Sequence, residues 1–375
     1  MRRKEISHSF DKNMVSLKTY RKLPKTQMRY AEIDSASHKR RYFIELVLSF
    51  MFFTFNLFSQ DIHFSQSHLS PLNLNPAETG RFDADYRAHI NQRTQWRSIT
   101  VPYVTFSASF EKKFNRLTLP GNLSAGLLFN SDKAGDGHFG TNQIGLSSSY
   151  LIPISDSLWE VSIGLLGMWN QNSVDYTKFY FDNQYNGYMY DPTIAPLEQF
   201  PRSQMHYFDI HGGLWVKRWI KPHIPFILGM AVYHINQPKK TFYQEINVKL
   251  DRKMTFYAQS SLPISQQTYL LPSIYWFKQK MLNEIYIGGL LYRKTQDLSF
   301  RGFYLGGWFR IGDAAILTTA IDYQNFHIGL SYDFNISPLV TASNGRGGLE
   351  IAIRYIFSNP TRIPLPEKHI CPTFL

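Results

Sequence analysis

The side chains that could carry out chemistry in this chain are twelve histidines, one cysteine and a scatter of carboxylates. No two histidines have the His-x-x-x-His or His-Glu spacing that would place two metal ligands on one helix face. Cys371 has no partner for a disulfide or for a cysteine metal site. No serine and histidine spacing indicates a hydrolase. The sequence therefore predicts no catalytic residue, no metal site and no bound cofactor, and it indicates a protein that is not an enzyme.

Several of the histidines fall instead in segments with a strong period of two. His211, His234 and His327 are predicted to lie on strands, as lumen or interface residues. His327 belongs to the run NFHIGLSYDF (325–334), in which five apolar residues alternate with five small or polar ones. This alternation puts the apolar side chains on one face of a strand and the polar ones on the other.

The same alternation recurs along the rest of the chain, with aromatic residues at many strand ends. Most of the predicted strands have 8–14 residues, near the ~9–11 that cross a bilayer with tilt. The aromatic content of 16% suits the girdles at the two membrane interfaces. We therefore expect an all-β fold, a single antiparallel transmembrane β-barrel of about 14 strands with lipid outside and water inside. The expected strands are Asp83–Trp96, Tyr103–Phe110, Asn122–Asn130, Thr141–Ile152, Leu158–Asn170, Met205–Arg218, Pro225–Ile235, Asp251–Ser260, Gln267–Lys278, Asn283–Tyr292, Phe300–Arg310, Asp313–Tyr323, Phe326–Phe334 and Gly348–Phe357.

The inward rows of these strands carry charge. Glu160, Glu350 and Arg354 each oppose an apolar row, a placement that is costly in lipid and favourable in a wet lumen. An even number of strands would put both termini on one side, predicted to be the periplasm. The long connections 171–204 and 335–347 would then face outward.

The net charge of +12 is concentrated at the N-terminus. Residues 1–41 hold 12 Lys and Arg side chains against four acidic ones, so little basic excess remains to attract nucleic acid. In residues 38–61 a basic cluster precedes an apolar run and a small residue, the pattern of a signal peptide with cleavage after Ser59. An uncleaved membrane anchor is the alternative interpretation. We therefore expect an exported protein that is integral to the outer membrane.

An ordered set of short motifs along the predicted mature chain resembles the PorP/SprF family of the type IX secretion system, found in the Bacteroidota. QDIHFSQ (60–66) is similar to the family's Gln-Asp-Pro-x-Phe-Ser-Gln opening, and CPTF (371–374) is similar to its terminal Cys-Pro-Arg-Phe. Ile62 and Thr373 depart from the family's usual proline and arginine. The motifs between these ends are LNPAETG (74–80), NQRTQWRSI (91–99), VPYVTFSASF (101–110), AGDG (134–137), YFDI (207–210), HINQP (234–238), RIGDAAI (310–316), GLSYDFNIS (329–337) and ASNGRGGLEIAIRY (342–355).

The resemblance implies a fourteen-stranded outer-membrane barrel that supports secretion and surface attachment of cargo or adhesin proteins and that works in gliding motility. Its expected partners are the periplasmic ring lipoproteins of the secretion apparatus, the C-terminal domain of a cargo or adhesin, and outer-membrane lipid. The expected parts are a removed extension and signal peptide (1–59), a periplasmic N-terminal segment or plug (60–82), the barrel (83–357) and a periplasmic tail (358–375). The candidate partner-binding or plug residues are Gln66, Asn75, Arg87, Arg93, Trp96, Asn344 and Arg346.

Two other functions remain open at this stage. A transporter or channel for small hydrophobic or other solutes would need apolar lumen walls near the N-terminal segment, whereas the inward rows read as Ser, Gly, Asn, Asp and Glu. A soluble, secreted β-sandwich would share the strand pattern but would be released without detergent.

Overall fold

The structure is a computed structural model that describes residues 61–97, 101–114, 120–135, 137–154, 156, 158–198, 201–221, 223–243, 248–338 and 340–358. The chain divides into two units, 1–59 and 60–375, and the description below concerns the second. The expected signal peptide and almost all of the expected C-terminal tail lie outside the described residues. In the described part of the chain, no helix is long and apolar enough to cross a membrane.

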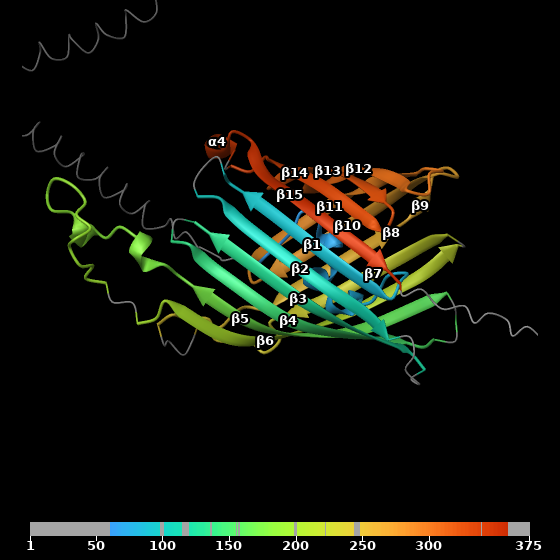
Figure 1. The fold of residues 1–375 in the computed structure, drawn as a ribbon, viewed down its shortest axis with the longest axis horizontal. Helices are drawn as coiled ribbons and strands as arrows, with labels where there is room; N and C mark the ends of the chain where they lie inside the picture. The colour runs from blue at the N-terminus through green and yellow to red at the C-terminus, as the bar shows by residue number, and fades with distance from the viewer. Residues whose placement is uncertain are drawn as a thin grey trace, which may run out of the picture. The chain divides into compact units, whose positions relative to one another are not determined.

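The described strands form one closed antiparallel barrel with fourteen wall strands (Figure 1). Neighbours in sequence pair with each other, and the ring closes where β15 pairs with β1. The two-residue β9 continues the wall beyond β8 by pairing with β10. The strands are β1 (Tyr86–Gln95), β2 (Tyr103–Phe114), β3 (Asn122–Ala134), β4 (Phe139–Ile152), β5 (Trp159–Ser173), β6 (Gln204–Lys221), β7 (Ile224–Tyr233), β8 (Lys253–Ser260), β9 (Leu262–Pro263), β10 (Thr268–Gln279), β11 (Leu282–Lys294), β12 (Phe300–Arg310), β13 (Ala314–Tyr323), β14 (Phe326–Asn335) and β15 (Arg346–Phe357).

The two faces of the wall follow the alternation in the sequence. In β14, Phe326, Ile328 and Leu330 are exposed on the outside, whereas His327 and Ser331 are buried inside. The outer apolar row is as exposed as expected for a surface covered by lipid, with Leu146 68% exposed. The predicted fourteen-stranded antiparallel barrel is therefore confirmed, and each predicted strand overlaps a wall strand.

The barrel has two unlike rims. At the closing rim, Tyr86 of β1 pairs with Phe357 of β15 and their rings stack 4.9 Å apart. The opposite rim, here called the long-loop rim, carries the connections 174–203 and 234–252. The first of these contains η4 (Tyr176–Lys178) and η5 (Asp182–Gln184) and projects from the barrel as the long green segment of Figure 1. The even strand number thus brings the beginning and the end of the barrel to one rim.

The segment ahead of β1 lies inside the barrel, where short helical turns η2 (Ser67–Leu69), α3 (Pro71–Leu74) and η3 (Pro76–Glu78) occupy the lumen (Figure 1, blue). Proline begins α3 and η3, a position in which its missing N–H costs no hydrogen bond. Residues 61–82 are called the lumen segment below. Its apolar side chains Phe64, Leu69, Leu72 and Leu74 are at most 2% exposed. A further short helix, α4 (Val340–Ser343), lies between β14 and β15.

The lumen wall differs in part from the expectation of uniformly polar inward rows. On β8 and β10–β12 the buried inward side chains include Tyr257, Tyr275, Tyr286 and Trp308, which pack in one cluster with Leu74. The expectation was wrong for this sector because inward aromatic residues face the lumen segment rather than water. Where the lumen is filled by protein, an apolar inward row is favourable.

Candidate functional site

The site with the most buried charge is the junction between the lumen segment and strands β1, β12, β14 and β15. At its centre the Asp333 carboxylate accepts hydrogen bonds from Arg93 Nη2 at 2.8 Å and from Arg310 Nη2 at 3.0 Å. Ser65 Oγ of the lumen segment donates to the same carboxylate at 2.7 Å. Arg93 Nη1 also donates to the carbonyl oxygen of His63 at 2.8 Å. Wall and segment are therefore joined through one carboxylate.

A second wall carboxylate completes this junction. Glu350 Oε2 accepts the backbone N–H of Ser65 at 2.6 Å, and its Oε1 accepts that of Gln66 at 3.0 Å. The Gln66 amide donates in turn to the Glu350 carbonyl oxygen at 3.4 Å. Glu350, Arg93, Arg310 and Asp333 are each at most 2% exposed, so two positive and two negative side chains share one desolvated site. Such an arrangement is stable only while every member keeps its partners.

Towards the closing rim, a further ion pair holds the end of the lumen segment. Arg87 binds Glu111 through two hydrogen bonds, of 2.8 and 2.7 Å, the fork geometry that makes arginine pairs specific. Arg87 also donates to the carbonyl oxygens of Glu78 and Arg81, and Glu111 accepts the backbone N–H of Gly80 at 2.9 Å. Burial raises the pKa of Glu78 to about 7, against the opposing effects of the Tyr257 hydroxyl and the Arg87 charge.

The middle of the lumen segment contacts the wall most closely at Asn75. Its amide donates to the carbonyl oxygen of Leu214 at 2.9 Å and to the Tyr257 hydroxyl at 3.2 Å, and its Oδ1 accepts the N–H of Ala77. At the next two residues of the segment, Pro76 and Ala77, the wall residue is Gly164, where a Cβ would lie 2.4 Å from the segment backbone. Only glycine permits this approach.

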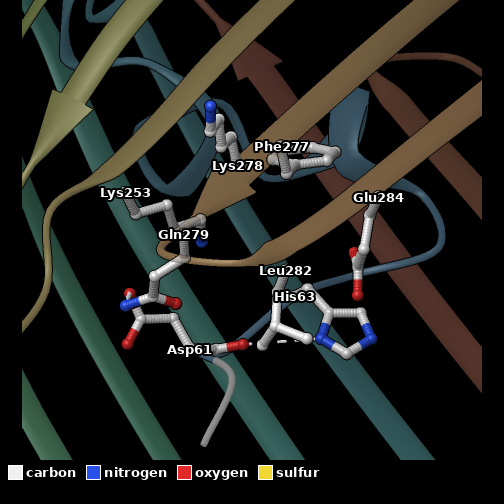
Figure 2. A pocket seen from close by; sticks show the side chains of 8 residues that line it. All are labelled: Asp61, His63, Lys253, Phe277, Lys278, Gln279, Leu282 and Glu284. Carbon is white, nitrogen blue, oxygen red and sulfur yellow. Dashed lines mark hydrogen bonds between the residues drawn. The ribbon is translucent and has the colours of Figure 1, made fainter. Parts of the chain in front are cut away.

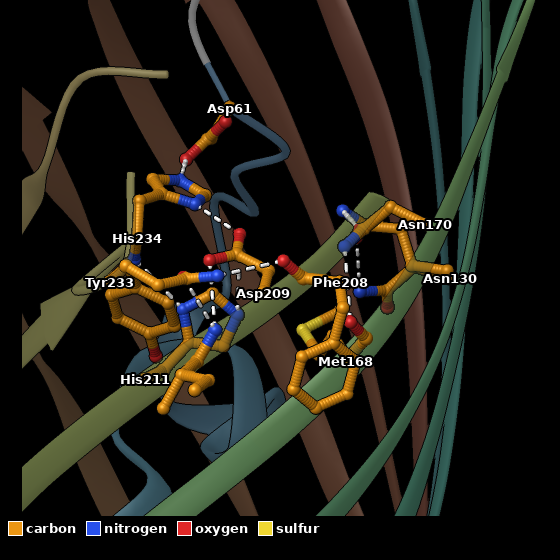
Figure 3. Close-up of polar contacts among 12 residues, drawn as sticks. Asp61, Asn130, Met168, Asn170, Phe208, Asp209, His211, Tyr233 and His234 are labelled. Carbon is orange, nitrogen blue, oxygen red and sulfur yellow. Dashed lines mark hydrogen bonds and ion pairs between the residues drawn. The ribbon is translucent and has the colours of Figure 1, made fainter. Parts of the chain in front are cut away.

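At the long-loop rim, Asp61 is held by a histidine between two carboxylates (Figure 3). His234 Nε2 contacts Asp61 Oδ2 at 2.6 Å, and its Nδ1 contacts Asp209 Oδ2. Burial alone would raise the pKa of the Asp61 carboxyl, but His234, Lys253 and Lys240 outweigh it and hold that pKa below its ordinary value. The three side chains therefore form a charged latch, with His234 protonated.

Asp209, His211 and His234 also bring three possible metal-ligand atoms within 4.8 Å of one another. However, His211 Nδ1 accepts the backbone N–H of His234 at 3.0 Å, which leaves the proton of a neutral ring on Nε2, the atom that would have to face a metal. Both ring nitrogens of His234 face carboxylates. This hydrogen-bond pattern fits the latch better than it fits a metal centre.

A small pocket opens beside the latch (Figure 2). Its lining combines charged and apolar side chains from the lumen segment, β8, the end of β10 and the start of β11, namely Asp61, His63, Lys253, Phe277, Lys278, Gln279, Leu282 and Glu284. Lys253 is 8% exposed, and its ammonium lies 5.4 Å from the Tyr233 ring centroid and 5.8 Å from that of Phe277. The pocket therefore belongs to the end of the lumen at which the segment begins.

The structure separates the seven candidate residues into two groups. Gln66, Asn75, Arg87 and Arg93 meet in the lumen contacts described above. Trp96, Asn344 and Arg346 lie at the long-loop rim instead. Trp96 has a positive φ of 56° and packs edge-on against Tyr103 with ring centroids 4.7 Å apart. Asn344 and Arg346 are exposed, Asn344 with a φ of 50°.

Sequence reasoning missed several of the buried partners. Asp333 was visible only as one polar member of an alternating strand, and Arg310, Glu111 and Asp209 were not singled out. The available signal was charge on inward rows, because Asp209 and Asp333 lie between apolar neighbours and Glu111 follows the outward Phe110. No spacing rule joins residues such as Ser65 and Asp333, which are 268 positions apart.

Comparisons with known proteins give one family and a set of distant barrels. The family model described as "Type IX secretion system membrane protein PorP/SprF" matches residues 56–355. Among solved structures, the CymD monoaromatic hydrocarbon channel is similar with 12% identity and a TM-score of 0.44, covering 79% of this chain and 94% of that one. The Ralstonia pickettii toluene transporter TbuX has 11% identity and a TM-score of 0.47, covering 77% and 93%. These likenesses are too distant to bear on what the chain binds. The comparison with curated proteins finds no match.

Proposed function

Since the chain belongs to the PorP/SprF family of type IX secretion system membrane proteins, we propose that it acts in the outer membrane through protein contacts made at its two rims. In this proposal the signal peptide is removed on export. The closing rim faces the periplasm and contacts the ring lipoproteins of the apparatus. The long-loop rim faces outward and contacts the C-terminal domain of a cargo or adhesin. The protein thereby supports the secretion and surface attachment of that cargo, including adhesins used in gliding.

The observation that carries this proposal is the way in which the lumen segment is held. It bonds to the wall at Asp61, Ser65, Asn75, Thr79 and Gly80, through groups that are largely buried. Displacing it would break the Asp61–His234 ion pair and would remove the donors that Ser65, Gln66 and Gly80 supply to the wall carboxylates. Each such loss costs free energy as long as the wall group stays buried. A barrel closed in this way is suited to act as a rigid platform.

The connection 174–203 offers the surface for an outer partner. Its described residues 174–198 include seven aromatic side chains, four acidic ones and one basic one. Tyr188 is 92% exposed, Leu197 81% and Tyr180 78%. Exposed tyrosines among short polar residues are typical of protein-binding loops, and an exposed apolar surface of this kind indicates a contact site. The acidic charge favours a partner surface that carries lysine or arginine.

A second candidate function is passage of small hydrophobic solutes, and the inward aromatic cluster of β8 and β10–β12 is the observation that favours it. In that case the lumen segment would have to move aside during each passage. The two functions therefore differ in whether the segment must be mobile.

The proposed function is tested by a clean deletion, followed by quantitative proteomics of the cell surface, the medium and the cell interior. We expect one large adhesin, or the type IX cargo as a group, to leave the surface and accumulate inside. Complementation with the wild-type gene should restore it. Normal surface display of every cargo in the deletion strain would refute the proposal.

A further inference from the structure

The lumen segment enters the barrel at the long-loop rim. At its beginning, Asp61 Oδ2 contacts His234 Nε2 at 2.6 Å and accepts from Gln279 Nε2 at 3.5 Å. His234 directly follows the last residue of β7, and Gln279 is the last residue of β10. Both strands end at the rim that carries the connections 174–203 and 234–252. The lumen segment therefore begins at this rim.

The lumen segment leaves the barrel at the closing rim. The carbonyl oxygen of Phe82 accepts a hydrogen bond from Lys113 Nζ, and that of Asp85 accepts the Lys113 N–H at 2.9 Å. Lys113 is the penultimate residue of β2, and β2 ends beside Tyr86, where β1 begins. The end of the segment thus lies at the rim at which β15 finishes.

Contacts between these two points follow the same order. Asn73 donates to Ser107 Oγ at 2.9 Å, near the middle of the wall. Six residues later, the Thr79 hydroxyl contacts Ser147 Oγ at 2.6 Å, and Ser149 Oγ donates to the Thr79 carbonyl oxygen at 2.6 Å. Because β4 ends at Ile152 on the closing rim, the contacts of Thr79 lie nearer the closing rim than those of Asn73. The segment therefore crosses the lumen once, without turning back.

From this path we infer that the protein presents the start of its lumen segment at one rim and the end of its last wall strand at the opposite rim. Asp61, the first described residue of the lumen segment, lies at the long-loop rim, and Phe357, the last residue of β15, lies at the closing rim. Resting on the proposed function for which rim faces outward, this puts the start of the lumen segment at the same rim as the connection 174–203, the rim that would meet the cargo. The apparatus in the periplasm would meet only the short turns of the closing rim and the end of β15.

This inference differs from the expectation that both termini lie in the periplasm. That expectation counted strands, and an even count does bring Tyr86 and Phe357 together. It did not include the return of the chain through the lumen, because residues 60–82 have no period from which a direction can be derived. The path follows instead from hydrogen bonds between residues that are far apart in sequence.

Cysteine labelling tests this arrangement in the full-length protein. In a Cys371→Ser background, single variants Ile62→Cys, Tyr188→Cys and Ser358→Cys would be treated with a membrane-impermeant maleimide on intact cells and after lysis. Ile62 is half-buried beside the latch, and Tyr188 and Ser358 report the two rims. We expect Ile62→Cys and Tyr188→Cys to react on intact cells, and Ser358→Cys to react only after lysis.

A second variant tests the same point without relying on the reactivity of the half-buried thiol in Ile62→Cys. An epitope tag inserted between Gln60 and Asp61 should bind antibody on intact cells, provided that Tyr188→Cys is labelled there as well. If the tag and Ile62→Cys instead follow Ser358→Cys, the inferred path is wrong. If Tyr188→Cys and Ser358→Cys exchange sides while the tag still follows Tyr188→Cys, the path stands and the orientation in the proposed function is wrong.

Discussion

The substitution Asp333→Asn should loosen the lumen segment far more than a matched change at the edge of the same site. Asp333 and Asp313 both bind Arg310, at 3.0 and 2.6 Å. The Asp333 side chain is 3% exposed and also binds Arg93, whereas the Asp313 side chain is 46% exposed. Removing one partner of a buried ion pair costs about 3–5 kcal/mol, but an exposed pair contributes at most about 1 kcal/mol.

The size of this effect can be stated as a rate of hydrogen exchange. An asparagine keeps the shape of Asp333 and one acceptor oxygen, so we use the lower limit, about 3 kcal/mol, for the lost stability of the segment. At 1.4 kcal/mol for each tenfold change, amide protection over residues 64–79 should fall about 100-fold. Hydrogen–deuterium exchange of the purified protein in detergent measures this directly. If Asp333→Asn changes the protection no more than Asp313→Asn does, the buried network does not hold the segment.

Two further predictions concern the latch and the contact of the segment with the wall. Burial opposes the charged form of His234, but Asp61 leads the carboxylates that raise its pKa from 6.5 to about 9. The latch should therefore be complete below pH 6.5 and be lost as the pH rises through about 9. In a Cys371→Ser background, a spin label on Ile62→Cys should become mobile over that range when His234 is present, but should show no such transition in His234→Gln. Gly164→Ala places a Cβ against the segment backbone and should increase exchange in the segment, whereas Gly167→Ala, whose Cβ meets the end of a flexible ring on the outer face, should not.

The fold was predictable because one physical rule acts on every wall residue. A strand between lipid and lumen must alternate, so stretches such as 325–334 and 141–152 reveal which residues lie on each face. The predicted strand ends differ from the observed ones by a few residues, because alternation shows the two faces of a strand more clearly than the point at which its pairing stops. Glu350 was also assigned correctly to the inner face, because an outward carboxylate would be costly in lipid.

The candidate site was predictable only in part. Gln66, Asn75, Arg87 and Arg93 were noted from their types and positions, but their partners depend on which height of the wall each residue of the lumen segment reaches. That height is decided by close packing, such as the approach at Gly164, and by hydrogen bonds that no periodicity encodes. The aromatic lumen sector was missed for the same reason, since its inward rows are apolar only where the segment covers them.

The most direct test of the central claim is to fix the lumen segment to the wall and ask whether secretion continues. The Thr79 and Ser147 hydroxyl oxygens lie 2.6 Å apart and both side chains are buried, so Thr79→Cys with Ser147→Cys in a Cys371→Ser background should form a disulfide. Surface proteomics would compare this strain with each single-cysteine strain, with and without a reducing agent. If the protein works through contacts at its rims, the locked barrel will display its cargo at the wild-type level. Loss of surface cargo that a reducing agent restores would show that the segment must move, and would contradict the account.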